Sequence, residues 1–119
     1  MTLDESHRAR ADALRSVVGI RGDLRTACAD LAAFGWDSSH ELIELTRSDA
    51  IRVLEAVLSG ELRPEEWRLW AETLEGRDDL AFEGGHADLL KEFLLESATP
   101  EIFDPLTAEV ATHWLSQLG

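Results

Sequence analysis

Five side chains that can bind a cation or transfer a proton are crowded between positions 78 and 88: Asp78, Asp79, Glu83, His86 and Asp88. Oxygen-rich groups of this kind can hold Mg²⁺ or Ca²⁺. Their spacing does not match the EF-hand loop, which needs ligands at alternate positions and a closing glutamate. The alternative is a solvated acidic loop in which one of the aspartates caps a neighbouring element. We therefore predict no metal site and no cofactor.

Residues suited to nucleophilic catalysis do not form a recognisable motif. The four histidines are scattered and make no H-E-x-x-H zinc motif. Ser38, Ser39 and His40 are adjacent in the sequence, but a catalytic triad is defined by its geometry in space. The single Cys28 excludes an intramolecular disulfide and a cysteine-based zinc site, and we expect it to be a small buried residue. The sequence therefore predicts no catalytic residues and no enzymatic activity.

Acidic residues gather within the stretch from Leu45 to Asp79 and form the strongest candidate binding surface. Glu65, Glu72 and Asp79 recur every seven residues, and Glu65, Glu72 and Glu75 can share one helix face opposite an apolar stripe. Arginines in the same stretch reduce its negative charge. The alternative to a binding surface is a solvated helix face without a binding role. The predicted partner-binding residues are Glu61, Glu65, Glu66, Glu72, Glu75, Asp78, Asp79 and Trp36.

The four tryptophans divide into two groups. Trp67, Trp70 and Trp114 lie on helical stripes, which predicts that they belong to the core. Trp36 lies in an expected loop. It is either an exposed anchor for a partner, since tryptophan is enriched in binding hot spots, or a plug over the end of the helical bundle.

The formal net charge of −13 over 119 residues limits the classes of partner. Direct binding of nucleic acid needs the opposite sign, because affinity comes largely from neutralised phosphates, and anionic membranes are disfavoured for the same reason. A basic protein partner is favoured, chiefly through the rate of association. The alternative is that the acidity only keeps the protein soluble. The excess of acids grows toward the C-terminus, where residues 85–119 hold six acids and one base.

Length and hydropathy indicate a single cytoplasmic domain. The first ten residues, MTLDESHRAR, lack the apolar region of a signal peptide, and no apolar run is long enough to span a membrane. A chain of this length suits one domain, residues 1–119. The oligomeric state is left open.

A helix hairpin at residues 45–79 is the element expected to position the acidic surface. Thr46 and Asp49 have a spacing related to the capping box, and Gly60 suits the left-handed end of a first helix. Pro64 suits the start of a second helix that ends at Gly76. The expected apolar stripe of the first helix is Ile51, Leu54 and Leu58, and that of the second is Trp67, Trp70, Ala71 and Leu74.

The rest of the chain is also predicted to be helical. Residues 3–18 form one helix, and residues 24–34 either continue it or form a second helix after two glycines. A short helix is expected from Ser38 to Leu45, with a buried connection through Leu42, Ile43 and Leu45 as the alternative. Further helices are expected at 86–97 and from Thr107 onward. Ile102 and Phe103 are expected to anchor the connector before the last helix. No strand pattern occurs, so the fold class is all-α, a bundle of about five or six helices.

At the hairpin, the chain resembles small acidic helical immunity proteins of bacteria, of the colicin D and contact-dependent growth-inhibition kind. The similar features are VLSGEL, the acidic start PEEW and the aromatic helix RLWAETLEGRDD. The later segment ATPEIFDPLT, followed by a terminal helix, is similar to a related group of uncharacterised bacterial proteins. The resemblance implies a cytosolic acidic bundle that plugs the basic cleft of a toxin nuclease. It supplies no motif from which site residues can be carried over.

Three functions follow from these features. The first is a non-enzymatic protein of the immunity or antitoxin type, whose carboxylates stand in for substrate phosphates in a basic partner. The second is a structural or oligomerising accessory protein with an apolar patch around Trp36 or Trp114. The third is a metal-dependent enzyme that uses the acidic loop near His86. We favour the first.

Overall fold

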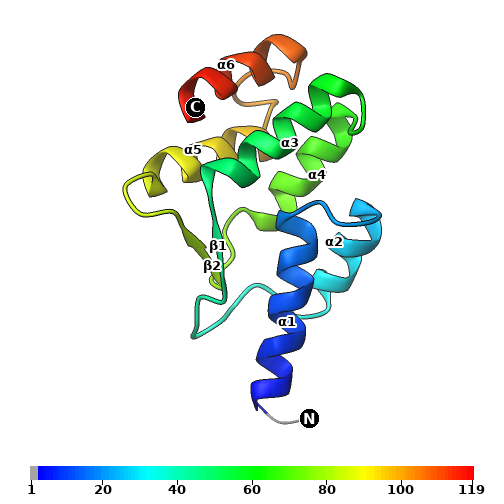
Figure 1. Cartoon of the computed structure of the whole chain (residues 1–119), viewed down its shortest axis with the longest axis vertical. Helices are drawn as coiled ribbons and strands as arrows, with labels where there is room; N and C mark the ends of the chain where they lie inside the picture. The colour runs from blue at the N-terminus through cyan, green and yellow to red at the C-terminus, as the bar shows by residue number, and fades with distance from the viewer. Residues whose placement is uncertain (1–2) are drawn as a thin grey trace.

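In a computed structural model, residues 3–119 form six helices and two three-residue strands (Figure 1). The predicted all-α class and the expected number of helices are therefore confirmed for this part of the chain. The elements in chain order are α1 (Leu3–Val18), α2 (Leu24–Ala32), β1 (Ile43–Leu45), α3 (Arg47–Ser59), α4 (Pro64–Leu74), β2 (Leu80–Phe82), α5 (Ala87–Ala98) and α6 (Ala108–Leu118).

Local signals in the sequence set the ends of α3 and α4 as predicted. Thr46 Oγ1 accepts a hydrogen bond from Asp49 N at 3.2 Å, and the Asp49 carboxylate accepts one from Thr46 N at 3.0 Å. Gly60 ends α3 with a φ of 86°, a left-handed conformation that glycine adopts without a Cβ clash. Pro64 opens α4, where its missing N–H removes no helical hydrogen bond.

The N-terminal region contains two helices and not one. Between α1 and α2, Ile20 and Gly22 have positive φ values of 45° and 64°, which a continuous right-handed helix does not allow. Asp23 then caps α2, because its carboxylate accepts a hydrogen bond from Thr26 N at 3.0 Å.

A parallel strand pair joins two segments that the sequence presented as helix and loop. In this pair Ile43 lies opposite Leu80, and Leu45 lies opposite Phe82. The prediction of a short helix from Ser38 to Leu45 is therefore wrong, and so is the expectation that the chain lacks strands. Each strand has three residues, which is too few for the longer alternation by which strands are recognised.

The core lies where α4 packs against α5 and α2, and where α3 packs against α6. Trp67, Trp70 and Phe93 are fully buried, and Trp114 is 6% exposed. Phe93 stands among the three indoles, with its ring centroid 6.5 Å from that of Trp67, 6.0 Å from that of Trp70 and 5.2 Å from that of Trp114. The prediction that these tryptophans belong to the core is confirmed. Cys28 is buried as well.

The face that α3 turns inward matches the predicted stripe only in part, because Leu54 is shared and Leu58 is not. Ala50, Val53 and Leu54 are fully buried, whereas Ile51 is half-buried and Leu58 is 43% exposed. Both the expected and the observed sets fit a helical period, so spacing alone does not decide between them. The observed face places small residues against the rest of the bundle.

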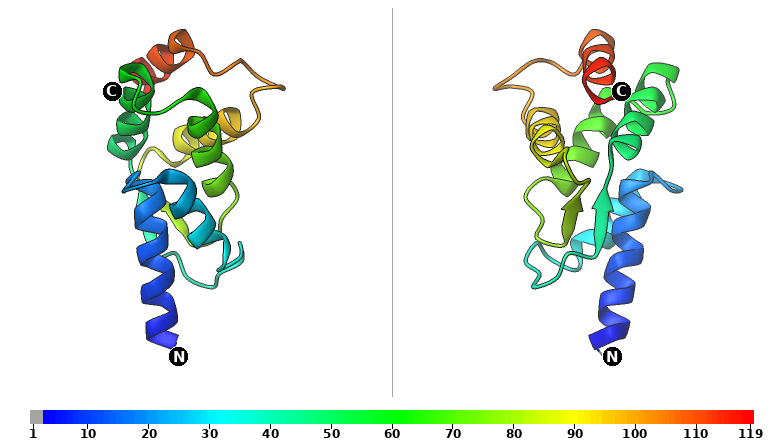
Figure 2. Two further views of the ribbon diagram at one scale, coloured as in Figure 1. Left: turned by 90° about the vertical axis from the view of Figure 1, so that its right-hand side faces the viewer. Right: turned by 60° about the vertical axis from the view of Figure 1, so that its left-hand side comes forward.

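The connector between α5 and α6, residues 99–107, also differs from the expectation. Ile102 is 73% exposed and Phe103 is 43% exposed, so the prediction that they anchor the connector to the core is wrong. Leu106 packs against the core from the same connector. Figure 2 shows that the connector stands out from the body of the molecule. Pro100 and Pro105 favour an extended backbone at the residues before them.

Candidate partner-binding site

The predicted acidic surface is a strip along α4 and its flanking loops. Its exposed members are Glu61, Glu65, Glu72 and Asp78, whereas Glu66 and Glu75 are half-buried. Glu66 Oε1 accepts a hydrogen bond from Arg63 N at 3.1 Å and thereby closes the N-terminus of α4. Glu72 Oε1 accepts one from Arg68 Nε at 2.9 Å. Two carboxylates of the strip are therefore engaged within the chain.

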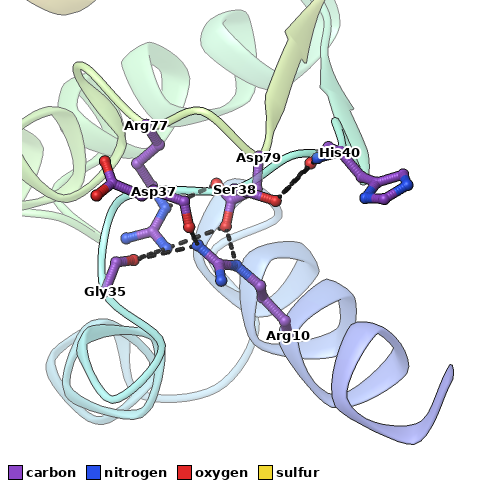
Figure 3. A network of polar contacts seen from close by, with 7 residues as sticks. All are labelled: Arg10, Gly35, Asp37, Ser38, His40, Arg77 and Asp79. Carbon is purple, nitrogen blue, oxygen red and sulfur yellow. Dashed lines mark hydrogen bonds and ion pairs between the residues drawn. The ribbon is translucent and has the colours of Figure 1, made fainter. Parts of the chain in front are cut away.

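Asp79 does not belong to this surface, so its placement there was a wrong prediction. Its side chain is fully buried, and the carboxylate accepts hydrogen bonds from Arg10 Nε at 2.6 Å and from Arg77 Nε and Nη2 at 2.9 and 3.1 Å (Figure 3). Burial acts to raise the pKa of Asp79, but the hydrogen bonds and charges of Arg77 and Arg10 outweigh it and lower this pKa. Asp79 is thus an internal counter-ion and does not face a partner.

The two arginines around Asp79 also hold the loop that follows α2. Arg77 Nη2 donates to the carbonyl oxygen of Gly35 at 2.6 Å, and Arg10 Nη2 donates to that of Asp37 at 2.8 Å. Figure 3 shows both guanidinium groups between this loop and the buried carboxylate. The network therefore joins α1, the loop and the start of β2, which is a structural role.

Trp36 is partly covered by the protein and partly exposed, so its role as a partner anchor stays a prediction. Its ring lies 5.3 Å from the guanidinium carbon of Arg77, so one part of the indole covers the buried ion pair. The carbonyl of Trp36 also accepts a hydrogen bond from Asp78 N at 3.2 Å. The residue is nevertheless 50% exposed, which leaves the remainder of the ring open to solvent.

The acidic residues weighed for metal chemistry do not converge. Glu83 accepts hydrogen bonds from Arg47 N at 2.8 Å and from Arg47 Nη2 at 3.1 Å, while Asp79 is held by its arginines. Within residues 3–119, no three His, Cys, Asp or Glu side chains are grouped to hold a metal ion. Ser39 Oγ lies 2.9 Å from His40 Nδ1, but both residues are exposed loop neighbours. We interpret that contact as local surface structure.

A groove with a volume of about 490 Å³ lies between α5 and α6 and brings together acids that the sequence analysis did not select. Its apolar lining comes from Leu89, Val110 and Trp114. No lysine or arginine of the described chain lines it. The acids that line this acidic groove are Glu92, Glu96, Asp104 and Glu109.

Repulsion between carboxylates is concentrated at Glu96. Its pKa is raised, first by burial, then by a hydrogen bond with the Glu92 carboxyl and by the negative charges of Glu92 and Asp104. The nearby His113 acts in the opposite direction. A carboxyl group whose pKa is raised by neighbouring negative charges inside a cleft marks a place where a cation would be favourable.

The sequence contained part of the signal for this groove. Glu92 and Glu96 are four positions apart on one helix, and Lys91 is the single base in residues 85–119. These acids looked like an ordinary solvated face, because the sequence does not place α6 beside α5. The acidic groove exists only through that packing, which positions Glu109 and Asp104 opposite the α5 pair.

Comparison with known proteins identifies no relative: no family model, curated protein or solved structure matches the chain. The resemblance to bacterial immunity proteins therefore stays a prediction. None of the helices in residues 3–119 has the length and apolar character needed to cross a membrane.

Proposed function

We propose that this protein is a non-enzymatic binding protein that captures a basic partner protein, in the manner of an immunity protein or antitoxin. The observation that supports this proposal is the acidic groove, in which four carboxylates line a cavity that no described lysine or arginine enters. A lysine or arginine side chain of the partner would supply the missing positive charge. It would also relieve the repulsion between Glu92 and Glu96.

The apolar lining of the groove suits the same kind of ligand. Lysine and arginine carry a hydrocarbon stem behind the charged head, and such stems pack well on apolar surface. Trp114, Leu89 and Val110 offer that surface beside the carboxylates. A basic side chain that enters the groove would therefore gain both contacts, which a free inorganic cation would not.

The charge of the whole chain extends the attraction beyond the groove. A net charge of −13 accelerates encounter with a positively charged partner. The affinity of such a complex falls when salt is added, because salt screens the attraction. The exposed acids of the α4 strip add to this field, because α4 packs against α5. A toxin nuclease is a suitable partner, since a cleft built for phosphates would accept these carboxylates instead.

The proposal can be tested with a library of a small three-helix domain whose surface is randomised, displayed on yeast and sorted against the full chain. The domains that are enriched are expected to carry an excess of lysine and arginine and to bind less tightly as the salt concentration rises. Enrichment of domains without such an excess would overturn the proposal.

A pair of charge-matched variants locates the binding site. The groove variant combines E92Q, E96Q, E109Q and D104N, and the control combines E41Q, E44Q, E55Q and D30N, all at exposed positions elsewhere. Both variants lose four negative charges, so a difference between them measures position and not net charge. We expect the groove variant to bind the enriched domains about ten-fold more weakly than the control. Equal binding would show that the groove is not the site.

A further inference from the structure

Two large exposed apolar residues are adjacent in the sequence of the connector between α5 and α6. Ile102 is 73% exposed and its neighbour Phe103 is 43% exposed. Figure 2 shows that their connector projects from the body of the molecule. Single exposed apolar residues are common, but an adjacent pair on a projecting segment offers a partner a compact apolar anchor.

A shallow groove lies between the connector and the start of α4. Pro64 at the start of α4 and Pro100, Pro105 and Leu106 of the connector line this groove of about 390 Å³. Glu65, Arg68 and Glu101 also line this groove, whereas Ile102 and Phe103 do not. The exposed pair is therefore a separate apolar feature of the connector.

The connector holds the pair in a defined conformation before any partner arrives. Ile102 N donates to the carbonyl oxygen of Thr99 at 3.0 Å, and Thr99 Oγ1 donates to that of Leu95 at 2.6 Å, which ties the turn to the end of α5. Arg68 of α4 forms an ion pair with Glu101 at 3.1 Å. These contacts reduce the backbone entropy that the connector loses on binding, a condition that favours affinity.

The charges around the connector indicate which kind of partner would bind the exposed pair. Asp104 adjoins Phe103 in the chain and lines the acidic groove. Arg68, the base beside Glu101, is already paired with Glu101 and Glu72. A second copy of the chain would carry the same net charge of −13 and would therefore be repelled. An anionic membrane would be repelled for the same reason. A basic protein surface is the occupant that this charge favours.

We propose that Ile102 and Phe103 are the apolar anchor of the complex and insert into an apolar pocket that is surrounded by basic residues on the partner protein. This inference rests on the proposed function, because the acidic groove supplies the charge that draws the same partner. Asp104 links the apolar pair to the acidic groove, because it follows Phe103 in the sequence and lines the groove. The partner's recognition surface is thus apolar at its centre and basic at its rim, the arrangement in which a few buried side chains carry most of the affinity.

The test compares I102A/F103A with L58A against domains sorted from the randomised three-helix library. Leu58 lies on α3 and is 43% exposed, as Phe103 is, so it controls for the loss of exposed apolar surface. The enriched domains are expected to present apolar residues ringed by lysine and arginine. We expect I102A/F103A to weaken their binding about ten-fold or more, and L58A to change it by less than about two-fold.

The outcomes separate the anchor from the proposed function. If basic domains are enriched but bind I102A/F103A as tightly as the unmodified chain, the anchor is wrong and the proposed function stands. If the enriched domains are not basic, both are wrong.

The anchor is also wrong if sedimentation velocity detects a dimer of the chain that I102A/F103A abolishes. Binding to phosphatidylglycerol vesicles that the same variant abolishes would likewise assign the pair to a membrane. Melting temperatures of both variants confirm that each is folded.

Discussion

Arg10 and Asp79 are 69 positions apart in the sequence, yet Arg10 Nε donates to Asp79 Oδ2 across 2.6 Å. Arg77, whose side chain is 2% exposed, donates to the same carboxylate from the other side. Two guanidinium groups thus share one buried counter-charge. The pairing fastens α1 to the segment that enters β2.

Replacing Asp79 by asparagine is expected to destabilise the protein strongly. The substitution keeps the size of the side chain but leaves two arginines at the site without their negative charge. Breaking a buried pair in this way lowers the free energy of unfolding by roughly 3–5 kcal/mol. Urea unfolding followed by tryptophan fluorescence measures the change. D12N is the control, because the Asp12–Arg15 pair is exposed and its loss is expected to cost less than about 1 kcal/mol.

Asp79 also predicts a loss of stability in acid. Its native pKa lies below its unfolded value, so the native state binds fewer protons than the unfolded state. The resulting stabilisation is complete above the ordinary aspartate pKa of about 3.9 and disappears as the pH falls through the lower native value. The difference in melting temperature between the unmodified chain and D79N should therefore be large at neutral pH and narrow in acid. A difference that does not depend on pH would contradict an ionised Asp79.

Glu96 predicts a pH dependence of the opposite sign. Because its pKa is raised, the native state keeps a proton that the unfolded state releases. The stability linked to that proton is present below the unfolded glutamate pKa of about 4.3 and is lost as the pH rises through the higher native value. E96Q is permanently neutral, so its melting temperature is expected to exceed that of the unmodified chain at pH 7 and to match it in acid. E44Q, at an exposed position, is the control.

Ser97 is expected to be required for the stability of the aromatic core. Trp67 Nε1 donates to Ser97 Oγ at 3.1 Å, and both residues are fully buried. S97A leaves the indole N–H without its acceptor and should lower the free energy of unfolding by about 1–3 kcal/mol. Ser116 on α6 is exposed, so S116A should change stability by less than about 0.5 kcal/mol. Equal melting temperatures for the two variants would argue against the hydrogen bond.

The parts of the fold that depend on neighbours in the sequence were predictable. Thr46 and Asp49 are three positions apart, and Gly60 and Pro64 act through their own backbone preferences, so the ends of α3 and α4 followed directly. The burial of Trp67 followed from its place on an apolar stripe. Each of these signals lies within one or two helical turns.

Features that depend on packing between distant segments were not predictable. The burial of Asp79 requires Arg10 from α1, and nothing near Asp79 in the sequence signals that partner. β1 and β2 pair across the whole α3–α4 hairpin. The acidic groove needs α6 beside α5 before Glu109 can face Glu96. The acids that lie close together in the sequence attracted the prediction, whereas those of the acidic groove come from two helices and the connector between them.

The distance along the chain between Arg10 and Asp79 has a consequence during translation. Arg10 is synthesised 69 residues before its carboxylate partner. At about 5–20 residues per second, the nascent N-terminal helix waits roughly 3–14 s for that partner. During this interval the guanidinium group of Arg10 lacks its native counter-ion, so α1 cannot be fastened to the rest of the fold until the segment that enters β2 has been made.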